Sequence, residues 1–435
     1  MQLRDMISKL EREGRLTHIR SPVSVEFEMA SIMATLLEKP VMFENVKESK
    51  FRVVGGMCSS RDLIAEALNT CKEDLIFKLA EAINNLKSPQ TVINAPCQEV
   101  VESPDLEKLP IMRYMPKDGG KYITSAICVV KDPEFETQNV CFHRLMLIDK
   151  NHLVARIVEN RGTDVALKKA GGELDIAICI GNSTASMLAA ATSLPMGIDE
   201  FSLANALERT DLVKCKTVDL KVPANTEIVL EGKITRNMHA EGPFLDLTTT
   251  YDKIREQPII EIKCITHRKD AIYQTLIPGM HEHRILMGMP KEPTIFNEVS
   301  KVCNCKNVYI TQGGGNWLHA IVQIIKQQPD DGKKAIDAAF KGHGSLKHCV
   351  VVDDDINIYD SDAVEWALAT RFQGDKDLVV KPSQPGSSLD PSADLTEGKK
   401  ALTCKVGFDA TIPWDKKDKS FKAESYAKVD LKKYM

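Results

Sequence analysis

Short apolar runs rich in β-branched and aromatic residues dominate residues 105–290, and they constrain the fold more than any other feature of the chain. Runs of this kind, bounded by polar turn residues, are typical of β-strands. The expected strands are 122–131, 139–149, 152–158, 212–221, 226–237, 257–266 and 271–277. An α/β insert interrupts them, with a helix at 163–170, a strand at 174–180 and helices at 183–193 and 199–208. The centre of the chain is therefore predicted to be a strand-built domain with an inserted α/β segment.

Both ends of the chain alternate between helix and strand patterns. Near the N-terminus the pattern predicts helices at 2–13, 26–37, 60–70 and 73–86, and strands at 40–44 and 51–55. Toward the C-terminus it predicts helices at 292–301, 331–341 and 361–371, strands at 306–311 and 347–353, a long loop at 374–400 and a Lys-rich surface end at 413–435. A chain of 435 residues is too long for one ordinary core. We therefore expect an α/β protein with an N-terminal α/β domain at 1–104, a central domain at 105–290 and a C-terminal α/β domain at 291–435.

The composition, with 43% apolar and 27% charged residues, is that of a soluble globular protein. A net charge of −4 gives no reason to expect nucleic acid or an anionic membrane as the main partner. No apolar run reaches the length of a membrane span, and the N-terminus lacks the apolar core of a signal peptide. Many of the twelve cysteines sit in strand-like apolar runs, where a free thiol behaves as a small hydrophobic group. We expect a cytoplasmic protein, with no structural metal at Cys303-Asn304-Cys305.

Several polar residues are set among the apolar residues of the second and third expected strands and the segment that follows them. They are Asn139, Arg144, Arg156, Arg161 and Gly162. An arginine in an apolar strand is costly unless it meets an anion. The group predicts an anion-binding wall, and solvated arginines on an exposed sheet face are the alternative. Because Asn139 and Arg144 are an odd number of positions apart, a regular strand would place them on opposite faces. A bulge, or a strand that starts after Asn139, is needed if both serve one site.

Two glutamates are expected on turns that follow strands. Glu241 precedes the turn Gly242-Pro243, and Glu282 follows Pro278-Gly279 on a loop mounted on a rigid sheet. A carboxylic acid that faces an arginine-lined apolar wall can donate or accept a proton when burial raises its pKa. Asn139 and Glu241 are hard oxygen donors, which suit Mg²⁺ or Mn²⁺ bridging a phosphate.

Three further motifs favour structural interpretations over ligand sites. Gly181-Asn182-Ser183-Thr184 lies between an expected strand and an expected helix, and it predicts a serine cap more than an anion site. Asp353-Asp354-Asp355 predicts solvated carboxylates at a strand end more than a cation site. His281-Glu282-His283 is not the helical zinc motif, although on a strand the two histidines would share a face.

The order and spacing of these residues resemble the UbiD family of reversible decarboxylases from about residue 20 to residue 411. The segments that carry the resemblance are Asn139-x4-Arg144, Arg156-Ile157-Val158, Arg161-Gly162, Leu230-Glu231-Gly232, Glu241-Gly242-Pro243-Phe244, Glu282 and Lys405-Val406-Gly407-Phe408-Asp409-Ala410-Thr411. An ordered set of this length is much more specific than any single motif. The resemblance implies that the central domain is a flavin-binding split β-barrel and that the C-terminal domain joins subunits into a homo-oligomer.

The resemblance also implies a cofactor. The family binds prenylated FMN, made by a separate flavin prenyltransferase, and ties its phosphate to the protein through Mn²⁺ or Mg²⁺ and a monovalent cation such as K⁺. Asn139 and Glu241 match the metal-ligand positions, and Asn160 stands where several relatives have a third ligand, a histidine. The positions that match cofactor contacts are Asn139, Phe142, His143, Arg144, Arg156, Ile157, Val158, Arg161, Gly162, Glu241 and Lys405. Arg144 also matches the arginine that holds the substrate carboxylate, and Glu282 matches the catalytic acid.

The compact length and several C-terminal segments look most like the archaeal branch of the family. That branch implies decarboxylation of trans-anhydromevalonate 5-phosphate to isopentenyl phosphate in a mevalonate pathway of isoprenoid biosynthesis. A phosphorylated substrate needs a further basic group, for which the candidates are His143, His281, His283 and Arg284. The alternatives are a decarboxylase of a 4-hydroxybenzoate-like aromatic acid, a flavin-dependent oxidoreductase, and a non-catalytic protein that keeps the fold.

Overall fold

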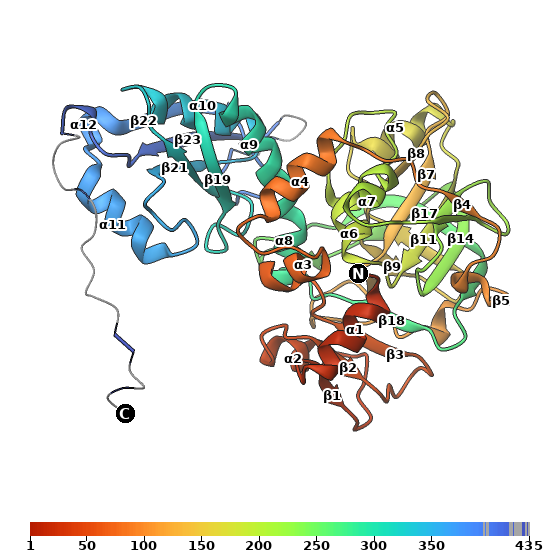
Figure 1. Cartoon of the computed structure of the whole chain (residues 1–435). Helices are drawn as coiled ribbons and strands as arrows, with labels where there is room; N and C mark the ends of the chain where they lie inside the picture. The colour runs from red at the N-terminus through yellow and green to blue at the C-terminus, as the bar shows by residue number, and fades with distance from the viewer. Residues whose placement is uncertain (395, 397–399, 417–420, 422–428, 431–432, 434–435) are drawn as a thin grey trace. The chain divides into compact units, whose positions relative to one another are not determined.

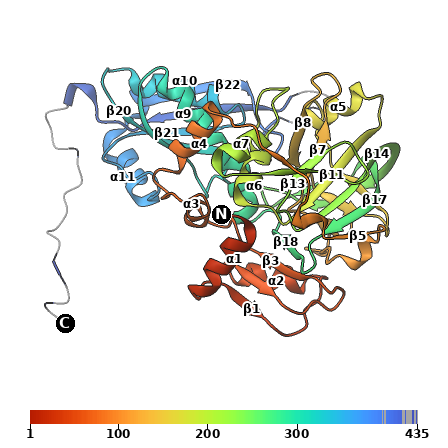
Figure 2. The same ribbon diagram turned by 45° about the vertical axis from the view of Figure 1, so that its right-hand side comes forward.

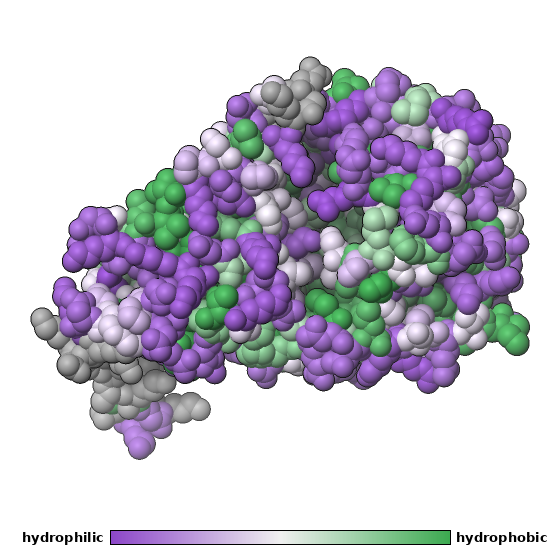
Figure 3. Space-filling model, turned by 90° about the horizontal axis from the view of Figure 1, so that it is seen from above, coloured by the Kyte–Doolittle hydropathy of each residue, from purple (hydrophilic) through white to green (hydrophobic). Residues whose placement is uncertain are grey.

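The computed structural model describes residues 1–394, 396, 400–416, 421, 429–430 and 433, so most of the Lys-rich end predicted at 413–435 lies outside the described residues. The chain forms two compact units, Met1–Pro293 and Thr294–Met435 (Figure 1). Within the described residues no helix combines the length and apolar character needed to cross a membrane. Polar residues cover most of the surface seen in Figure 3, and apolar residues form separate patches on it.

The first unit is built on a nine-stranded, wholly antiparallel sheet (Figure 2). Its path runs β6 (Tyr122–Ile123), β9 (Leu145–Leu147), β10 (His152–Ala155), β17 (Arg255–His267), β14 (Ile228–Glu241), β11 (Leu174–Ile180), β7 (Ile127–Lys131) and β8 (Gln138–Phe142), and β5 (Val100–Glu102) pairs with β17. Buried residues of both faces form two apolar clusters. The strand-built centre with an inserted α/β segment is therefore confirmed.

Four strand predictions were wrong in extent, and one of them, 212–221, divides into β12 (Leu212–Lys214) and β13 (Lys221–Pro223). The run 122–131 divides into β6 and β7, which lie at different places in the sheet. The run 139–149 divides into β8 and β9, and these also have different neighbours. The break between them falls at His143-Arg144, and it removes the face conflict between Asn139 and Arg144 because no regular strand joins the two. The run 226–237 continues as β14 to Glu241, so that residue ends a strand.

The inserted segment packs buried helices beside the sheet. It contains α5 (Gly162–Lys169), α6 (Thr184–Ala191) and α7 (Phe201–Leu207), and α6 contacts α7 and β8. The Ser183 hydroxyl accepts a hydrogen bond from the Ser186 amide at 3.2 Å, which confirms the serine cap. Two small sheets complete this region, formed by β4 (Thr91–Val92), β12 (Leu212–Lys214) and β13 (Lys221–Pro223), and by β15 (Phe244–Leu245) and β16 (Tyr251–Asp252).

The N-terminal residues form a four-stranded sheet that recruits one strand from far along the chain. Its order is β1 (Thr17–Ile19), β2 (Val41–Phe43), β3 (Arg52–Gly55) and β18 (Ile272–Thr275), with β18 parallel to β3. The sequence predicted β18 as part of the central series, and this was wrong. The surrounding helices are α1 (Leu3–Arg12), α2 (Glu28–Thr35), α3 (Arg61–Ala67) and α4 (Leu75–Asn84), and short 3₁₀ turns follow at Pro96–Gln98 and Leu106–Lys108. The pairing of β3 with β18 brings residues after 275 beside the N-terminal segment.

The second unit is a five-stranded mixed sheet with helices. The order is β19 (Asn304–Ile310), β20 (His319–Ile325), β21 (His348–Asp353), β23 (Leu402–Asp409) and β22 (Leu378–Pro385). Its helices are α9 (Glu292–Ser300, which begins at the end of the first unit), α10 (Asp331–Gly342), α11 (Ser361–Arg371) and α12 (Gly374–Asp377), with a 3₁₀ turn at Trp414–Lys416. The prediction of a loop at 374–400 was wrong for the first half of this range, which forms α12 and β22.

The carboxylates at the end of β21 are not left to solvent as predicted. Asp353 and Asp355 bind the buried guanidinium of Arg371, at 3.1 and 2.7 Å. A fully buried arginine needs such partners because desolvating its charge is expensive. The Asp353–Asp355 segment is thus a structural ion-pair site within the second unit.

Gly342, the last residue of α10, provides a test of packing in the second unit. A Cβ added there would lie 2.6 Å from the Ile295 Cα and 2.9 Å from the Thr294 carbonyl oxygen, which are backbone atoms of α9. We predict that Gly342→Ala lowers the free energy of unfolding by about 1–3 kcal/mol through overpacking. Urea denaturation measures the effect, with Gly344→Ala as the matched control because nothing lies within 4 Å of its added Cβ. Equal stabilities of the two variants would contradict the packing described for α9 and α10.

Candidate active site

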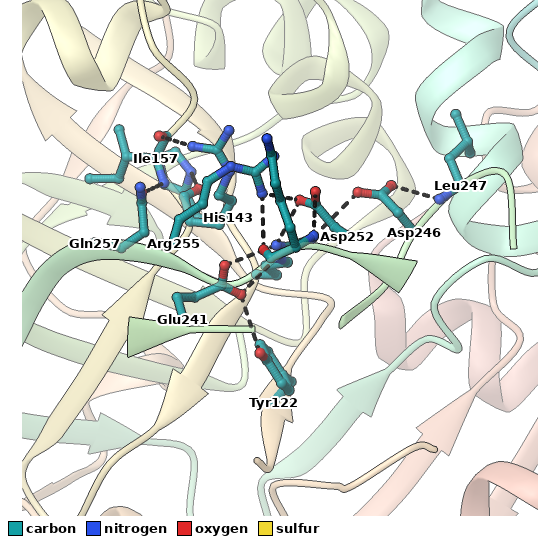
Figure 4. Close-up of polar contacts among 12 residues, drawn as sticks. Tyr122, His143, Ile157, Glu241, Asp246, Leu247, Asp252, Arg255 and Gln257 are labelled. Atoms are coloured by element: carbon teal, nitrogen blue, oxygen red, sulfur yellow. Dashed lines mark hydrogen bonds and ion pairs between the residues drawn. The ribbon is translucent and has the colours of Figure 1, made fainter. Parts of the chain in front are cut away.

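Arg144, which lies in the break between β8 and β9, pairs with the carboxylates of Glu241, Asp246 and Asp252. Figure 4 shows these three carboxylates close together. The Arg144 Nε and Nη2 donate to the two oxygens of Glu241 at 2.8 and 2.9 Å. Nη2 also donates to Asp252 at 3.0 Å, and Nη1 reaches Asp246 at 3.4 Å. The guanidinium is largely buried and lies 5.1 Å from the Phe244 ring centroid. Its neighbours are thus three carboxylates and an aromatic face.

This cluster leaves a small capacity for a further anion. A guanidinium has five N–H donors, and the four bonds above use four of them. The Tyr122 hydroxyl donates to Glu241 at 3.2 Å, and Arg255 donates to Asp252 at 2.6 Å. Glu241 is therefore held by two groups, whereas the long Asp246 contact is the one that a ligand carboxylate displaces most easily.

Asn139, on β8, lies one residue before a backbone amide that binds the buried Glu200. Glu200, just before α7, accepts a hydrogen bond from the Val140 amide at 2.7 Å, so its carboxyl lies beside Asn139 on the chain. Gly162 packs so closely that an added Cβ would lie 2.0 Å from the Asn139 Oδ1, which explains why this position is glycine. The Asn139 amide oxygen therefore lies at the start of α5, and the Glu200 carboxyl lies at the next residue of β8.

The Glu200 carboxyl has no compensating cation within the described residues, although it is almost fully buried. Burial raises its pKa to about 8. A carboxylate in such a place is stabilised by a bound cation. By contrast, Glu241 already has the bidentate charge of Arg144 and makes no contact with Asn139 among the described residues. The role of Asn139 and Glu241 as metal ligands stays a prediction, and Glu200 is a further candidate.

His143 is a structural residue in this arrangement. Its Nδ1 lies 3.1 Å from the Arg156 carbonyl oxygen, and its Nε2 lies 3.0 Å from the Thr163 hydroxyl. Burial lowers its pKa to about 4, so the ring is neutral at physiological pH. A neutral, fully engaged ring does not supply the additional positive charge that a substrate phosphate would need.

The remaining predicted cofactor contacts lie around the ends of β8 and β10. Phe142 ends β8 and is partly buried, Ile157 is buried and donates its amide to Gln257, and Val158 is 45% exposed. The Arg156 side chain donates to the Ile157 carbonyl at 2.6 Å and to Glu159 at 3.2 Å. Arg161 is exposed at the N-terminus of α5. Their part in cofactor binding stays a prediction.

Lys405 belongs to the second unit of the chain. It lies on β23, its Nζ donates to the Gly344 carbonyl oxygen at 2.6 Å, and it contacts the Phe340 ring. Burial lowers its pKa. Its part in cofactor binding stays a prediction.

Glu282 lies in the first turn of helix α8 (His281–Gly288), and the prediction that it projects from a loop was wrong. Its side chain is buried, with 1% of the residue exposed. Its two oxygens accept hydrogen bonds from the Gly56 amide at 3.0 Å and the Cys58 amide at 2.6 Å. Burial raises its pKa to about 8. A buried carboxyl whose pKa is near the working pH has the property required of a proton donor.

The start of α8 also lies against the Arg144 cluster. The Arg284 Nε donates to the Leu247 carbonyl oxygen at 3.1 Å, and the Leu247 amide binds Asp246 at 2.6 Å. The charges of Asp246 and Arg144 both act on the buried ring of His283. The proton-donor candidate and the arginine cluster therefore belong to neighbouring segments that the turn at Asp246-Leu247 connects, although no direct contact joins Glu282 to Arg144 among the described residues.

Sequence reasoning missed Glu200, and a signal for it was present. The segment Asp199-Glu200-Phe201 places two acids at the start of a helix that is otherwise apolar, where burial of a carboxyl is costly. Glu38 and Tyr122 were missed as well. Among the described residues no group of three or more His, Cys, Asp or Glu side chains could hold a metal, which includes the segments around Cys303 and His281.

Comparison with known proteins identifies relatives over most of the chain. Residues 7–83, 90–281 and 284–410 match the N-terminal, Rift-related and C-terminal domains of the 3-octaprenyl-4-hydroxybenzoate carboxy-lyase family, UbiD. The anhydromevalonate phosphate decarboxylases of Methanosarcina mazei and Methanothermobacter thermautotrophicus are 45% and 41% identical, over 94% of this chain and 96% and 97% of theirs.

A solved structure is similar over the full length. The UbiD-class enzyme HmfF from Pelotomaculum thermopropionicum, in complex with FMN, has a TM-score of 0.94 and 36% identity, and the match covers 100% of both chains. An evolved dimeric form of HmfF in complex with prFMN has a TM-score of 0.91 and 35% identity. The fold, the matched domains and the sequence identity agree that this chain belongs to the UbiD family.

Proposed function

We propose that this protein is a prenylated-FMN-dependent decarboxylase that converts trans-anhydromevalonate 5-phosphate into isopentenyl phosphate and CO₂. The observation that carries the proposal is a buried carboxyl, Glu282, on a segment adjacent to an arginine cluster in a fold shared with an enzyme solved in complex with prFMN. Relatives named anhydromevalonate phosphate decarboxylase at 41–45% identity support the substrate.

The residues around Asn139 fit a flavin phosphate held through a divalent cation. Asn139 and Glu200 supply an amide oxygen and a carboxylate, the donor types that Mn²⁺ and Mg²⁺ take. Glu200 is buried without a cation among the described residues, which is the charge imbalance that a metal ion would correct. Arg161 and the start of α5 add positive potential beside these two ligands.

When bound, prenylated FMN would supply an electrophilic centre that could take up the electron pair released with CO₂. The chain's own residues orient the substrate and manage the proton. Arg144 offers the remaining N–H, together with the weak Asp246 position, to the substrate carboxylate. The C–C bond breaks, CO₂ departs, and the carbon that carried the carboxylate takes one proton from Glu282. Glu282 then regains a proton from solvent, so each turnover consumes one proton.

Arg284 is the best candidate for the substrate phosphate. His143 is neutral and buried, and burial also lowers the pKa values of His281 and His283. Arg284 bonds to protein through its Nε, and its two terminal nitrogens make no bond to protein within the described residues. Its Nε bonds to the Leu247 carbonyl oxygen, next to Asp246, so a phosphate bound there would lie on the side of α8 that faces the Arg144 cluster.

The function is tested by CO₂ release from protein co-produced with a flavin prenyltransferase. The substrate panel contains trans-anhydromevalonate 5-phosphate, its unphosphorylated acid and 4-hydroxybenzoate. Preferential turnover of the phosphorylated acid supports the proposal. Turnover of the aromatic acid alone favours the second substrate class, and NAD(P)H oxidation without CO₂ release favours a flavin oxidoreductase.

Replacing the proton donor tests the site directly. We predict that Glu282→Gln folds and retains flavin but decarboxylates about 10²–10⁴-fold more slowly, because an amide cannot transfer a proton to carbon. The exposed Glu28→Gln on α2 is the control for loss of one carboxylate. Near-normal turnover by Glu282→Gln would remove it from the proposed role.

Substitutions distinguish between Glu200 and Glu241, the two candidate glutamate ligands of the metal. We predict that Glu200→Gln and Asn139→Ala lose Mn²⁺ and retain less flavin, because each removes an oxygen donor or its charge. Glu241→Gln should keep the metal and impair substrate binding, because it disturbs Arg144. Mass spectrometry measures the bound metal, and the flavin absorbance measures the bound flavin. Metal loss from Glu241→Gln but not from Glu200→Gln would reverse the assignment.

Arg284→Gln tests the phosphate contact. Hydrogen bonds to a charged group contribute about 1.5–3 kcal/mol, so KM for the phosphorylated acid should rise about 10–100-fold. The unphosphorylated acid is the internal control, and its KM should stay nearly constant. An equal rise for both acids would show that Arg284 does not bind the phosphate.

A further inference from the structure

Lys291 ends the 3₁₀ turn Met289–Lys291 that follows helix α8, and its side chain is partly buried. Its Nζ donates a hydrogen bond to the Ser193 hydroxyl at 2.9 Å. Ser193 lies two residues after the last residue of α6. A partly buried ammonium group gives up some of its hydration, so such groups are rare on a protein surface without a purpose. The bond to Ser193 holds this amine at a fixed place near the end of α6.

A second cation, Arg161, lies close enough to act on the Lys291 amine. The pKa of Lys291 is lowered to about 8, by burial and by the positive charge of Arg161. Arg161 is the exposed residue before α5, and its guanidinium makes no hydrogen bond or ion pair within the part of the chain that the structure describes. Two neighbouring positive charges repel each other unless an anion lies between them. The pair therefore indicates a place for an anion.

The start of α5 adds donors of the same kind. This helix has eight residues, and no side chain caps its first turn. The first amides of a helix have no partner inside it and carry the positive end of the helix dipole, so they favour a bound anion. The acid in this turn, Asp164, is already bound to the Asn160 amide at 2.7 Å and to Lys168. Its charge is therefore compensated on the protein itself.

The number and kind of these donors distinguish between anions. A carboxylate has one negative charge and two oxygens, and a single guanidinium can satisfy it, as Arg144 does for Glu241. A phosphomonoester carries a charge close to −2 at neutral pH and has three acceptor oxygens. An ammonium, a guanidinium, a hydroxyl and helix amides together match the charge and the oxygens of a phosphomonoester better than those of a carboxylate.

Two molecules of the proposed reaction carry a phosphomonoester, and Lys291 is related to both. On one side, Arg161 and the start of α5 adjoin Asn139, where the cofactor phosphate is proposed to bind. On the other, Arg284 lies seven residues before Lys291 in the same helical run, which is about two turns. Residues at that spacing project from the same side of a helix. Arg284 is the candidate for the substrate phosphate.

We propose that Lys291 and Arg161, with the Ser193 hydroxyl and the start of α5, form a phosphomonoester-binding position. Lys291 is its specificity-determining contact, because its ammonium is the charge that an unphosphorylated ligand leaves unused. The carrier of the phosphate, flavin or alkenoic acid, rests on the proposed function, whereas phosphate binding itself is a property of the chain. Lys291 takes no part in bond breaking or proton transfer.

The direct experiment measures how fast Lys291 is acetylated by acetic anhydride at neutral pH, read by peptide mass spectrometry of the full-length protein. The ligands are FMN, riboflavin, trans-anhydromevalonate 5-phosphate and its unphosphorylated acid. At about ten times its Kd, a ligand whose phosphate covers the amine should slow acetylation about tenfold. Lys108, whose side chain is 60% exposed, is the internal control, and its rate should not change.

The two pairs of ligands, each differing by one phosphate, identify the carrier. Protection by FMN but not by riboflavin assigns the position to the cofactor phosphate. Protection by the phosphorylated acid but not by the unphosphorylated acid assigns it to the substrate phosphate. Equal protection within both pairs, or no protection by any of the four ligands, would overturn the proposal.

Substitutions provide a second measurement that needs no turnover. Lys291→Met removes the charge and keeps the apolar stem, so Kd of the protecting ligand should rise about 10–100-fold. Lys291→Arg should recover most of the affinity, and Lys108→Met should leave it unchanged. Flavin fluorescence or titration calorimetry measures Kd. An unchanged Kd in Lys291→Met would contradict the assignment. Protection and a raised Kd in a protein that releases no CO₂ would keep the phosphate position and reject the proposed function instead.

Discussion

The parallel pairing of β18 with β3 is the constraint on which the site depends. It takes residues 272–275 out of the central region and aligns them with residues 52–55 of the N-terminal sheet. Consequently the turn and helix that follow β18 start against the loop that follows β3. Because successive residues in both segments are bound through backbone amides, the position of Glu282 is set by main-chain geometry more than by flexible side chains. Such support favours the precise placement that proton transfer requires.

Three buried carboxyls of the first unit, those of Glu200, Glu241 and Glu282, differ in how their charge is compensated. Glu241 is neutralised by a bidentate arginine, so its charge is already compensated and it organises Arg144. Glu200 and Glu282 are bound by backbone amides, and burial raises the pKa of each. A buried carboxyl without a counter-charge can avoid the free-energy cost of burying its charge in two ways. It can bind a cation, or it can keep its proton. In our account Glu200 does the first and Glu282 does the second.

Local sequence signals predicted much of the fold and part of the site. Alternating and β-branched runs identified the central strands, and Ser183 before an apolar run identified a helix start. The family resemblance is confirmed by the matched domains. The roles of Arg144 and Glu282 stay predictions, although the structure buries both and joins their segments at Asp246-Leu247.

What sequence reasoning missed depends on contacts between distant segments. The sequence of residues 271–277 does not indicate that this strand pairs with residues near 53. Tertiary packing determines the partner of a parallel strand. Pro278-Gly279 suggested a loop, yet a helix begins two residues later because Glu38 caps it from another part of the chain. Glu241 was grouped with Asn139 from donor type and family resemblance, and its ion pair with Arg144 is seen only in the fold.

The most direct test of this account is an experimental structure of the protein loaded with prenylated FMN and a non-reacting analogue of trans-anhydromevalonate 5-phosphate. The account predicts that the Glu282 carboxyl lies within hydrogen-bond reach of the carbon that receives the proton, with Glu38 still bound to the His281 amide. Arg144 should contact the analogue's carboxylate, and Asn139 and Glu200 should contact the metal. A structure in which Glu282 faces solvent, or in which another acid lies over the reacting carbon, would contradict it.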